Sequence, residues 1–245
     1  MTASAPALTG LALEPLRGGI SMLQGIATMV AAPFEKKCRG RGQPVMVLPG
    51  LGTNEHATFV MRRFLIGLGY RARDWGQGIN TGPRGNLDMF LQLHLQEQLQ
   101  AVYHVCKRQK VVLLGWSLGG IFARELAKLR PDLVELVISM GTPLTGDPDA
   151  TNAKFLYELF NGPSELADRL LLERIKQPPP VPCISIYSRS DGVVAWQSCV
   201  TDPQGSTRGI EVEGVSHLGL MSHPAALRAV AGVLSAHFSS RSERS

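Results

Sequence analysis

The sequence predicts an α/β fold in which helices cover both faces of a mostly parallel sheet. Two observations support this prediction. Short runs rich in Val, Ile and Leu are bounded by turn residues, and segments with helical periodicity alternate with them. Near-continuous apolar runs suit strands buried on both faces, and strands separated by helices pair in parallel. The 245 residues contain no repeat or long linker, so we expect one large domain.

The strands and helices are expected in alternation along the chain. The clearest strand candidates are Pro44–Leu48, Lys110–Leu114, Leu133–Met140 and Pro182–Tyr187, and the weaker ones are Tyr70–Trp75 and Gly209–Glu213. Helical periodicity marks His56–Leu68, Asn86–Arg108 with Asn86 as its N-cap, Leu118–Leu129, and Pro224–Phe238, which begins with a proline.

The chain is predicted to have three parts. Residues 1–43 form an N-terminal extension packed on the body, residues 44–238 form the α/β domain, and residues 239–245 form a flexible tail. Within the domain, residues 142–180 contain helix-like pieces but no clear strand. An insertion of this kind between two sheet strands predicts a helical cap over the mouth of a site.

The apolar stretch Ile20–Ala32 is interrupted by polar residues and is well short of the roughly 20 apolar residues that span a bilayer. It also lacks the basic start and small-residue cleavage site of a secretory signal. We expect an amphipathic helix lying on the body. Peripheral contact with a membrane through this N-terminal segment is the alternative.

Charge and cysteine content argue against a nucleic-acid-binding protein and against a fold held together by disulfides. The net charge is +5, but basic residues are scattered, and no nucleic-acid-binding motif is present. The one local cluster, Lys36, Lys37, Arg39 and Arg41, is interpreted as a solvated loop, with a headgroup or nucleic-acid patch as the alternative. Four irregularly spaced cysteines predict reduced thiols and a cytoplasmic protein, with a Cys183–Cys199 disulfide left open.

Gly115-Trp116-Ser117-Leu118-Gly119 matches the G-x-S-x-G nucleophile elbow. The five-residue pattern alone is weak, but it directly follows an apolar strand and begins a helix. A strand–turn–helix with serine at its apex is what the chemistry requires, because the hydroxyl then stands clear of the sheet. Ser117 is the predicted nucleophile. The alternative is a glycine-rich start of a helix without chemistry.

A serine hydroxyl needs a base to take its proton and an acid to orient that base. Asp191 follows the strand Pro182–Tyr187 at the carboxyl edge of the sheet and is the preferred acid. His217 lies between the last strand and the closing helix and is the preferred base. Asp147, Asp149 and the weaker Asp202 are fallback acids, and His223 is the competing base.

The oxyanion formed during acyl transfer needs two backbone N–H donors. Leu118, the residue after the nucleophile, supplies one. The other usually comes from a loop after an early strand, and Leu48-Pro49-Gly50-Leu51-Gly52 is such a loop, so we assign it to Leu51. A plain glycine turn is the alternative.

The ordered set PGLG, GWSLGG, SRSDGVV and GVSHLGL resembles the α/β-hydrolase superfamily, and within it the bacterial esterase/lipase-like members, over roughly residues 44–238. Pro49-Gly50 stands where many lipases carry His-Gly, which is tolerated because the donor is a backbone group. Neither a secretion signal nor a disulfide set is evident, unlike in many secreted lipases.

The resulting hypothesis is a serine hydrolase that cleaves carboxylic esters, without metal or organic cofactor, through an acyl-enzyme on Ser117. Trp116 beside the nucleophile and the Phe- and Leu-rich cap favour an apolar ester or lipid substrate, although both could be ordinary packing residues. The alternatives are an acyltransferase or thioesterase on the same triad, and a non-catalytic binding protein of this fold.

Overall fold

Six strands form one parallel sheet in the order β2-β1-β3-β4-β5-β6 in the computed structural model, which describes residues 5–31, 38–83, 86–145, 173–200 and 207–242. The strands are β1 (Pro44–Leu48), β2 (Arg71–Asp74), β3 (Val111–Trp116), β4 (Val134–Met140), β5 (Cys183–Tyr187) and β6 (Thr207–Glu211). Leu48 pairs with Gly115 and Trp116 with Met140, so the carboxyl ends of the central strands meet at one edge.

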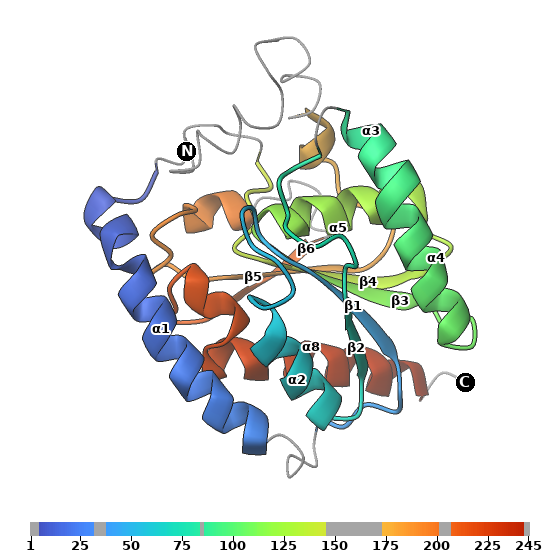
Figure 1. The fold of residues 1–245 in the computed structure, drawn as a ribbon, viewed down its shortest axis with the longest axis horizontal. Coiled ribbons are helices and arrows are strands. Elements are labelled where there is room, and N and C mark those ends of the chain that lie inside the picture. Colours follow the sequence, from blue (N-terminus) through green and yellow to red (C-terminus); the bar gives the residue numbers. More distant parts are fainter. Residues whose placement is uncertain (1–4, 32–37, 84–85, 146–172, 201–206, 243–245) are drawn as a thin grey trace.

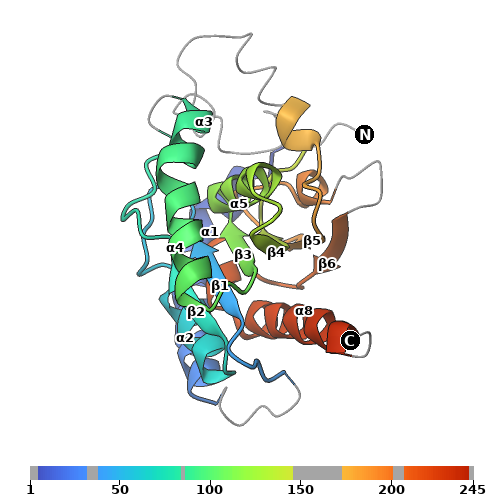
Figure 2. The same cartoon turned by 90° about the vertical axis from the view of Figure 1, so that its right-hand side faces the viewer.

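The helices cover both faces of this sheet (Figures 1 and 2). The helices of the described residues are α1 (Leu8–Ala31), α2 (Phe59–Gly67), α3 (Leu87–Phe90), the π-helix η2 (Leu91–Leu95), α4 (Gln96–Val105), α5 (Leu118–Leu129), the 3₁₀-helices η4 (Trp196–Cys199) and η5 (Leu218–Met221), and α8 (Pro224–Ser242), and all except α1 belong to the layers around the sheet or to its loops.

The alternation of side chains along each strand creates two separate cores. On β1, Val45 and Val47 pack toward α2 and α8, whereas Met46 and Leu48 pack toward α4 and α5. All four side chains are fully buried. Strands buried on both faces therefore read as continuous apolar runs, as the sequence indicated. The predicted α/β architecture is confirmed.

Helix α1 lies outside these layers, against α2, α8 and η5 (Figure 1). It begins at Leu8, twelve residues before the predicted stretch, and continues through Pro15. Its buried positions are Glu14, Ser21 and Gly25, whereas most of its large apolar residues are exposed. The large apolar residues of this segment therefore mark the outer surface of the helix and not its packed side.

Other boundaries shift by a few residues. The helix expected over Asn86–Arg108 is continuous but contains the π-helical turn η2, and the Asn86 side chain caps it by accepting hydrogen bonds from the Asp88 and Met89 N–H groups. α8 continues to Ser242, into the expected tail. Most of the expected cap, residues 142–180, lies outside the described residues. Within its described part, residues 173–176 are helical.

The four cysteines are free thiols, so the disulfide between Cys183 and Cys199 that the sequence left open is absent. Among the helices of the described segments, none has the length and apolar character needed to cross a bilayer.

Candidate active site

Ser117 occupies the sharp turn between β3 and α5 with φ 54° and ψ −121°, a conformation that is costly for a residue with a side chain. The turn is tight because its flanking residues have no Cβ. A Cβ on Gly115 would lie 2.2 Å from the Gly119 carbonyl oxygen, and one on Gly119 would lie 2.4 Å from the Leu48 carbonyl oxygen. The G-x-S-x-G pattern is therefore explained by close backbone packing.

Neighbouring backbone holds the elbow in place. The Ser117 N–H donates to the Met140 carbonyl at 2.8 Å, and the Ser117 carbonyl accepts from the Thr142 hydroxyl at 3.1 Å. These contacts join the nucleophile turn to the carboxyl end of β4, so the sheet supports the strained residue from the adjacent strand.

Asp191 and His217 form a direct buried pair. The distance from Asp191 Oδ2 to His217 Nδ1 is 2.7 Å, and the two residues are 5% and 4% exposed. The other carboxylate oxygen, Oδ1, accepts from the Val193 and Val194 N–H groups, each at 2.8 Å. Asp191 belongs to the acid loop, residues 188–194 after β5, and His217 to the base loop, residues 212–218 after β6. This pairing leaves Nε2 as the ring nitrogen that can act as a base.

The environment of His217 favours its protonated form. Burial by itself would lower the pKa of the imidazole, but the Asp191 carboxylate, through its charge and its hydrogen bond, and the charge of Glu14 outweigh burial. The net effect raises the pKa of His217 above its ordinary value. Such a base is well suited to accept a proton and to hold it during the reaction.

Two residues join the elbow to this pair. The Trp116 indole Nε1 donates to the His217 carbonyl at 3.1 Å, and the two rings lie 5.5 Å apart. Gly141 follows Met140, and a Cβ there would lie 3.1 Å from both Asp191 Oδ2 and His217 Nδ1. These contacts place the turn at Ser117, which is 5% exposed, beside the Asp191–His217 pair.

The structure gives Trp116 a different contact from the one inferred. The sequence predicted a contact with substrate. In the structure the Trp116 side chain is buried, its ring packs against Gly50, and its indole N–H holds the base loop through the His217 carbonyl. Contact with substrate stays a prediction.

The loop assigned to the oxyanion hole lies beside the elbow. Leu118 is the first residue of α5, so its N–H has no acceptor within the helix. Leu51 lies in the turn after β1, and Gly119 packs directly on the backbone of Leu48 and Pro49. Asn80 secures this loop: its side chain donates to the Pro49 carbonyl at 2.8 Å, and its own carbonyl accepts from the Gly52 N–H at 2.7 Å.

The structure describes the alternative base, His223, but not the alternative acids. His223 Nδ1 accepts from the Ala225 N–H at the start of α8, as a helix-capping residue does. Burial and, to a lesser degree, Arg228 lower the pKa of His223. The fallback acids Asp147, Asp149 and Asp202 lie outside the described residues.

Sequence reasoning missed four residues that support the site: Glu14, Arg17, Asn80 and Gly141. Glu14 and Arg17 carried one detectable signal, because they are the only charged residues among the first 34. Asn80 and Gly141 gave none, since asparagine and glycine in loops usually mark turns.

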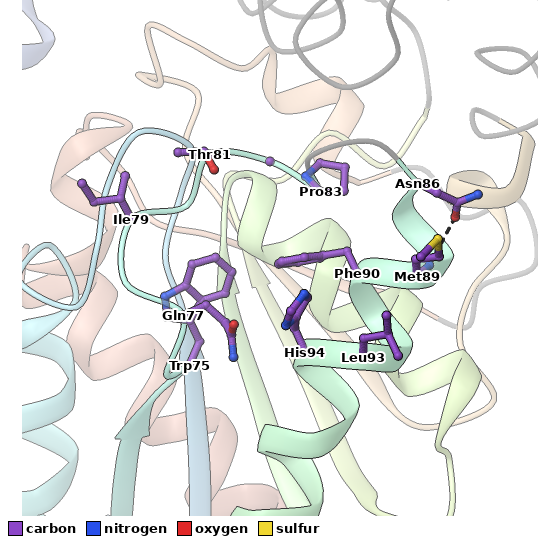
Figure 3. A pocket seen from close by; sticks show the side chains of 11 residues that line it. Trp75, Gln77, Ile79, Thr81, Pro83, Asn86, Met89, Phe90, Leu93 and His94 are labelled. Carbon is purple, nitrogen blue, oxygen red and sulfur yellow. Dashed lines mark hydrogen bonds between the residues drawn. The ribbon is translucent and has the colours of Figure 1, made fainter.

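A pocket of about 290 Å³ lies between residues 75–83 and the α3–η2 helices, and its walls include the rings of Trp75, Phe90 and His94 (Figure 3). No residue of the Ser117–Asp191–His217 set lines it, but the segment that forms one wall also carries Asn80, which fixes the predicted oxyanion loop. Within the described part of the chain, no group of three or more His, Cys, Asp or Glu side chains could hold a metal ion.

Comparison with family models and with curated protein sequences finds no match. Among solved structures, the chain is similar to a monoacylglycerol lipase from Paleococcus ferrophilus (15% identity, TM-score 0.56, covering 80% of this chain and 96% of that one). It is also similar to a structure from the metagenome-derived lipolytic enzymes LipS and LipT (12%, 0.59, 80% and 94%). A third is a 2-hydroxy-6-oxo-6-phenylhexa-2,4-dienoate hydrolase from Rhodococcus (16%, 0.53, 82% and 92%).

With the parallel sheet, the elbow after β3 and the acid and base loops after β5 and β6, the chain has the α/β-hydrolase fold. The similarity in structure at such low identity defines the fold, and the chemistry of the site must be argued from its own residues.

Proposed function

We propose that this protein is a serine hydrolase that cleaves carboxylic esters. The observation that supports this most directly is the buried Asp191–His217 pair beside a serine held in a strained elbow. Strain of this kind is retained where the surrounding structure enforces it, and a purely structural serine would need neither the strain nor the oriented imidazole.

The proposed reaction proceeds in two half-reactions. Ser117 Oγ attacks the ester carbonyl while His217 takes its proton, and the N–H groups of Leu51 and Leu118 stabilise the oxyanion. The tetrahedral species collapses as the His217 imidazolium protonates the leaving alcohol, which leaves an acyl group on Ser117. Water, deprotonated by His217, then attacks the acyl carbonyl and releases the acid and the free serine.

An apolar acyl or alcohol group is the proposed substrate class. Two of the structural neighbours are described as lipolytic enzymes, although the third acts on a different class of compound. The pocket beside the Asn80 segment offers exposed apolar side chains such as Ile79, Met89 and Leu93. These features support a hydrophobic substrate and leave the chain length to experiment.

We further propose that the outer side of α1 contacts a lipid surface. This lipid-facing side carries Leu8, Leu13, Leu16, Ile20, Leu23 and Val30, each at least half exposed. The basic cluster at Lys36, Lys37, Arg39 and Arg41 follows the helix in sequence, which is the charge expected for anionic headgroups. The described helices do not span a bilayer, so the proposed contact is peripheral.

The nucleophile is tested with a fluorophosphonate probe on wild type, Ser117→Ala and Ser139→Ala. Ser139 is a buried serine on β4 whose hydroxyl makes only a 3.4 Å hydrogen bond, so it is a matched control. We expect labelling of wild type and Ser139→Ala and none of Ser117→Ala. Turnover of p-nitrophenyl esters of increasing chain length should fall about 10⁴-fold or more in Ser117→Ala.

The outcomes separate the proposed hydrolase from its alternatives. Labelling without release of acid, but with acyl transfer to an added alcohol or amine, would favour an acyltransferase. Faster turnover of thioesters than of matched oxygen esters would favour a thioesterase. Folded wild-type protein that takes up no probe would contradict the proposal and favour a binding protein.

A further inference from the structure

Glu14 carries a buried carboxylate that the hydrolytic mechanism does not use. It is 2% exposed, although it lies on a helix whose large side chains mostly face solvent. Its Oε1 accepts from the Gly192 N–H at 2.8 Å and the His217 N–H at 2.9 Å, and its Oε2 accepts from the Leu218 N–H at 3.0 Å. One side chain thus binds the backbone of the residue after the catalytic acid and of the base itself.

Arg17, one helical turn further on, joins the same two loops through their carbonyl groups. Its guanidinium donates to the Ser190 carbonyl of the acid loop at 2.8 Å and to the Gly214 carbonyl of the base loop at 3.1 Å. The two loops leave different strands, β5 and β6, and α1 crosses both. Together, Glu14 and Arg17 make five hydrogen bonds between the N-terminal helix and the loops that carry Asp191 and His217.

Glycine residues on α1 let the helix pack closely enough against the acid and base loops for these hydrogen bonds to form. A Cβ on Gly18 would lie 2.7 Å from Leu218 Cβ, and one on Gly25 would lie 2.0 Å from the Ser222 carbonyl oxygen. The acid loop also has a glycine at this contact, because a Cβ on Gly192 would lie 2.5 Å from the Gly10 carbonyl carbon. The helix therefore packs backbone against backbone, which is what brings a short carboxylate within reach of three N–H groups.

We propose that Glu14 is a positioning residue for the catalytic acid and base, and that α1 must be docked through it for the site to be competent. This inference rests on the proposed hydrolase function. Without the carboxylate, three N–H groups lose their acceptor, two of them in buried contacts, and Arg17 alone of the two side chains still joins the acid and base loops. The Asp191–His217 distance is then less firmly fixed from the side of α1.

Glu14 also acts on His217 electrostatically. The charges of Asp191 in the acid loop and of Glu14 on α1 both raise the pKa of His217. The cation on the same helix, Arg17, bonds to the carbonyls of Ser190 and Gly214 in these two loops. Removing the Glu14 charge lets the pKa of His217 fall. Because the base must be neutral to act, the acidic limb of the pH–rate profile should then move to lower pH.

The test compares Glu14→Gln with Glu135→Gln in the full chain. Glutamine keeps one oxygen acceptor but replaces the other with an NH₂ group, which cannot accept a hydrogen bond from a backbone N–H. Glu135 is the control because it is another buried carboxylate, bonded to His237 at 2.7 Å on the far end of β4 from the site. In Glu14→Gln we expect a fluorophosphonate labelling rate about 10–100-fold below wild type and the acidic limb shifted to lower pH. Both should be unchanged in Glu135→Gln.

Amide hydrogen exchange supplies a readout that does not depend on activity. In Glu14→Gln, the amides of Gly192, His217 and Leu218 should exchange at least tenfold faster than in wild type, while amides of the central strands keep their protection. If the wild type takes up no probe, the proposed function fails, yet this exchange pattern still tests whether Glu14 holds the acid and base loops in place.

Two results would overturn the inference. One is a folded Glu14→Gln protein with wild-type labelling, pH profile and exchange at the three amides. The other is that Glu14→Gln and Glu135→Gln lose the same amount of labelling and the same amount of thermal stability. The loss would then be a general effect of placing an amide in a buried position. If Glu14→Gln does not fold, Glu14→Asp decides the question, because it keeps the charge but shortens the side chain that reaches the three N–H groups: wild-type labelling and wild-type exchange at the three amides in that variant reject the proposal.

Discussion

The chemistry of this site depends on single residues placed at backbone positions that tolerate little change. Ser117 adopts a positive φ that only tight packing enforces, and Gly141 leaves room for Asp191 and His217 to meet. Gly141 itself has a φ of 54°. A side chain there would be strained, and its Cβ would lie 2.6 Å from Leu220 Cδ1 and crowd the Asp191–His217 pair at 3.1 Å, so the site needs glycine for two independent reasons.

The acid at position 191 is predicted to set both the rate and its pH dependence. Asp191→Asn keeps the shape but removes the charge that offsets burial, so the pKa of His217 should fall. We expect kcat/KM for p-nitrophenyl esters to fall about 10³–10⁴-fold at neutral pH, because the wrong tautomer is favoured. The acidic limb of the residual activity should move to lower pH.

A pH–rate profile of Asp191→Asn beside Asp132→Asn checks this prediction. Asp132 is an exposed carboxylate paired with Arg130, and its loss should leave the profile as in wild type. An acidic limb that stays in place in Asp191→Asn would show that Asp191 does not tune this base.

At the scale of elements, the segment around residues 173–176 is attached to the body by a buried acid of α5. The Glu125 side chain is 1% exposed and accepts from both Lys128 and Arg174, while Arg174 also pairs with Asp88 of α3 at 2.6 Å. The Lys128 ammonium donates to the Arg174 carbonyl as well. Burial lowers the pKa of Lys128, and the charge of Glu125 works against that shift.

Arg174→Met should lower the free energy of unfolding by about 1–2 kcal/mol, because Glu125 loses one of its two cationic donors in a buried position. Chemical denaturation measures this value. Lys176→Met is the matched control: it removes an exposed pair with Glu173 and should cost at most about 0.5 kcal/mol. Equal effects of the two substitutions would contradict a structural role for Arg174.

At the scale of the whole molecule, α1 has two sides with different functions in our proposals. One side bonds to the acid and base loops, and the opposite side offers apolar residues to the surroundings. A helix that contacts a lipid surface on one side and the catalytic loops on the other lies close to where an apolar ester would leave the lipid phase.

Sedimentation with phosphatidylcholine vesicles containing phosphatidylglycerol tests the lipid-facing side. We expect Leu16→Asp/Leu23→Asp to reduce the bound fraction severalfold, since charged residues are expelled from the apolar interface. Val105→Asp is the control, because Val105 is equally exposed but lies on α4, which Figure 1 shows across the molecule from α1. Equal binding of all three proteins would contradict lipid contact through α1.

The strand candidates, the turn at Ser117 and the loop positions of Asp191 and His217 were all predictable from sequence, because each depends on a local pattern, whereas the chemical roles of these residues stay predictions. Strands buried on both faces are continuous apolar runs, and a strand followed at once by a glycine-flanked serine and a helix has few structural solutions. The order of β3, β5 and β6 along the chain then places Ser117, Asp191 and His217 at one edge of a parallel sheet.

What the tertiary structure alone decided are contacts between segments far apart in the chain. Glu14 bonds to residues 178 to 204 positions away, and Asn80 to the loop after β1, 31 positions back. The large apolar residues of α1 point outward because glycine and serine pack more closely than leucine against the loops that carry Asp191 and His217. Backbone amides that need an acceptor leave no mark on local sequence, so only the fold could show that the carboxylate of Glu14 meets the backbone N–H of His217.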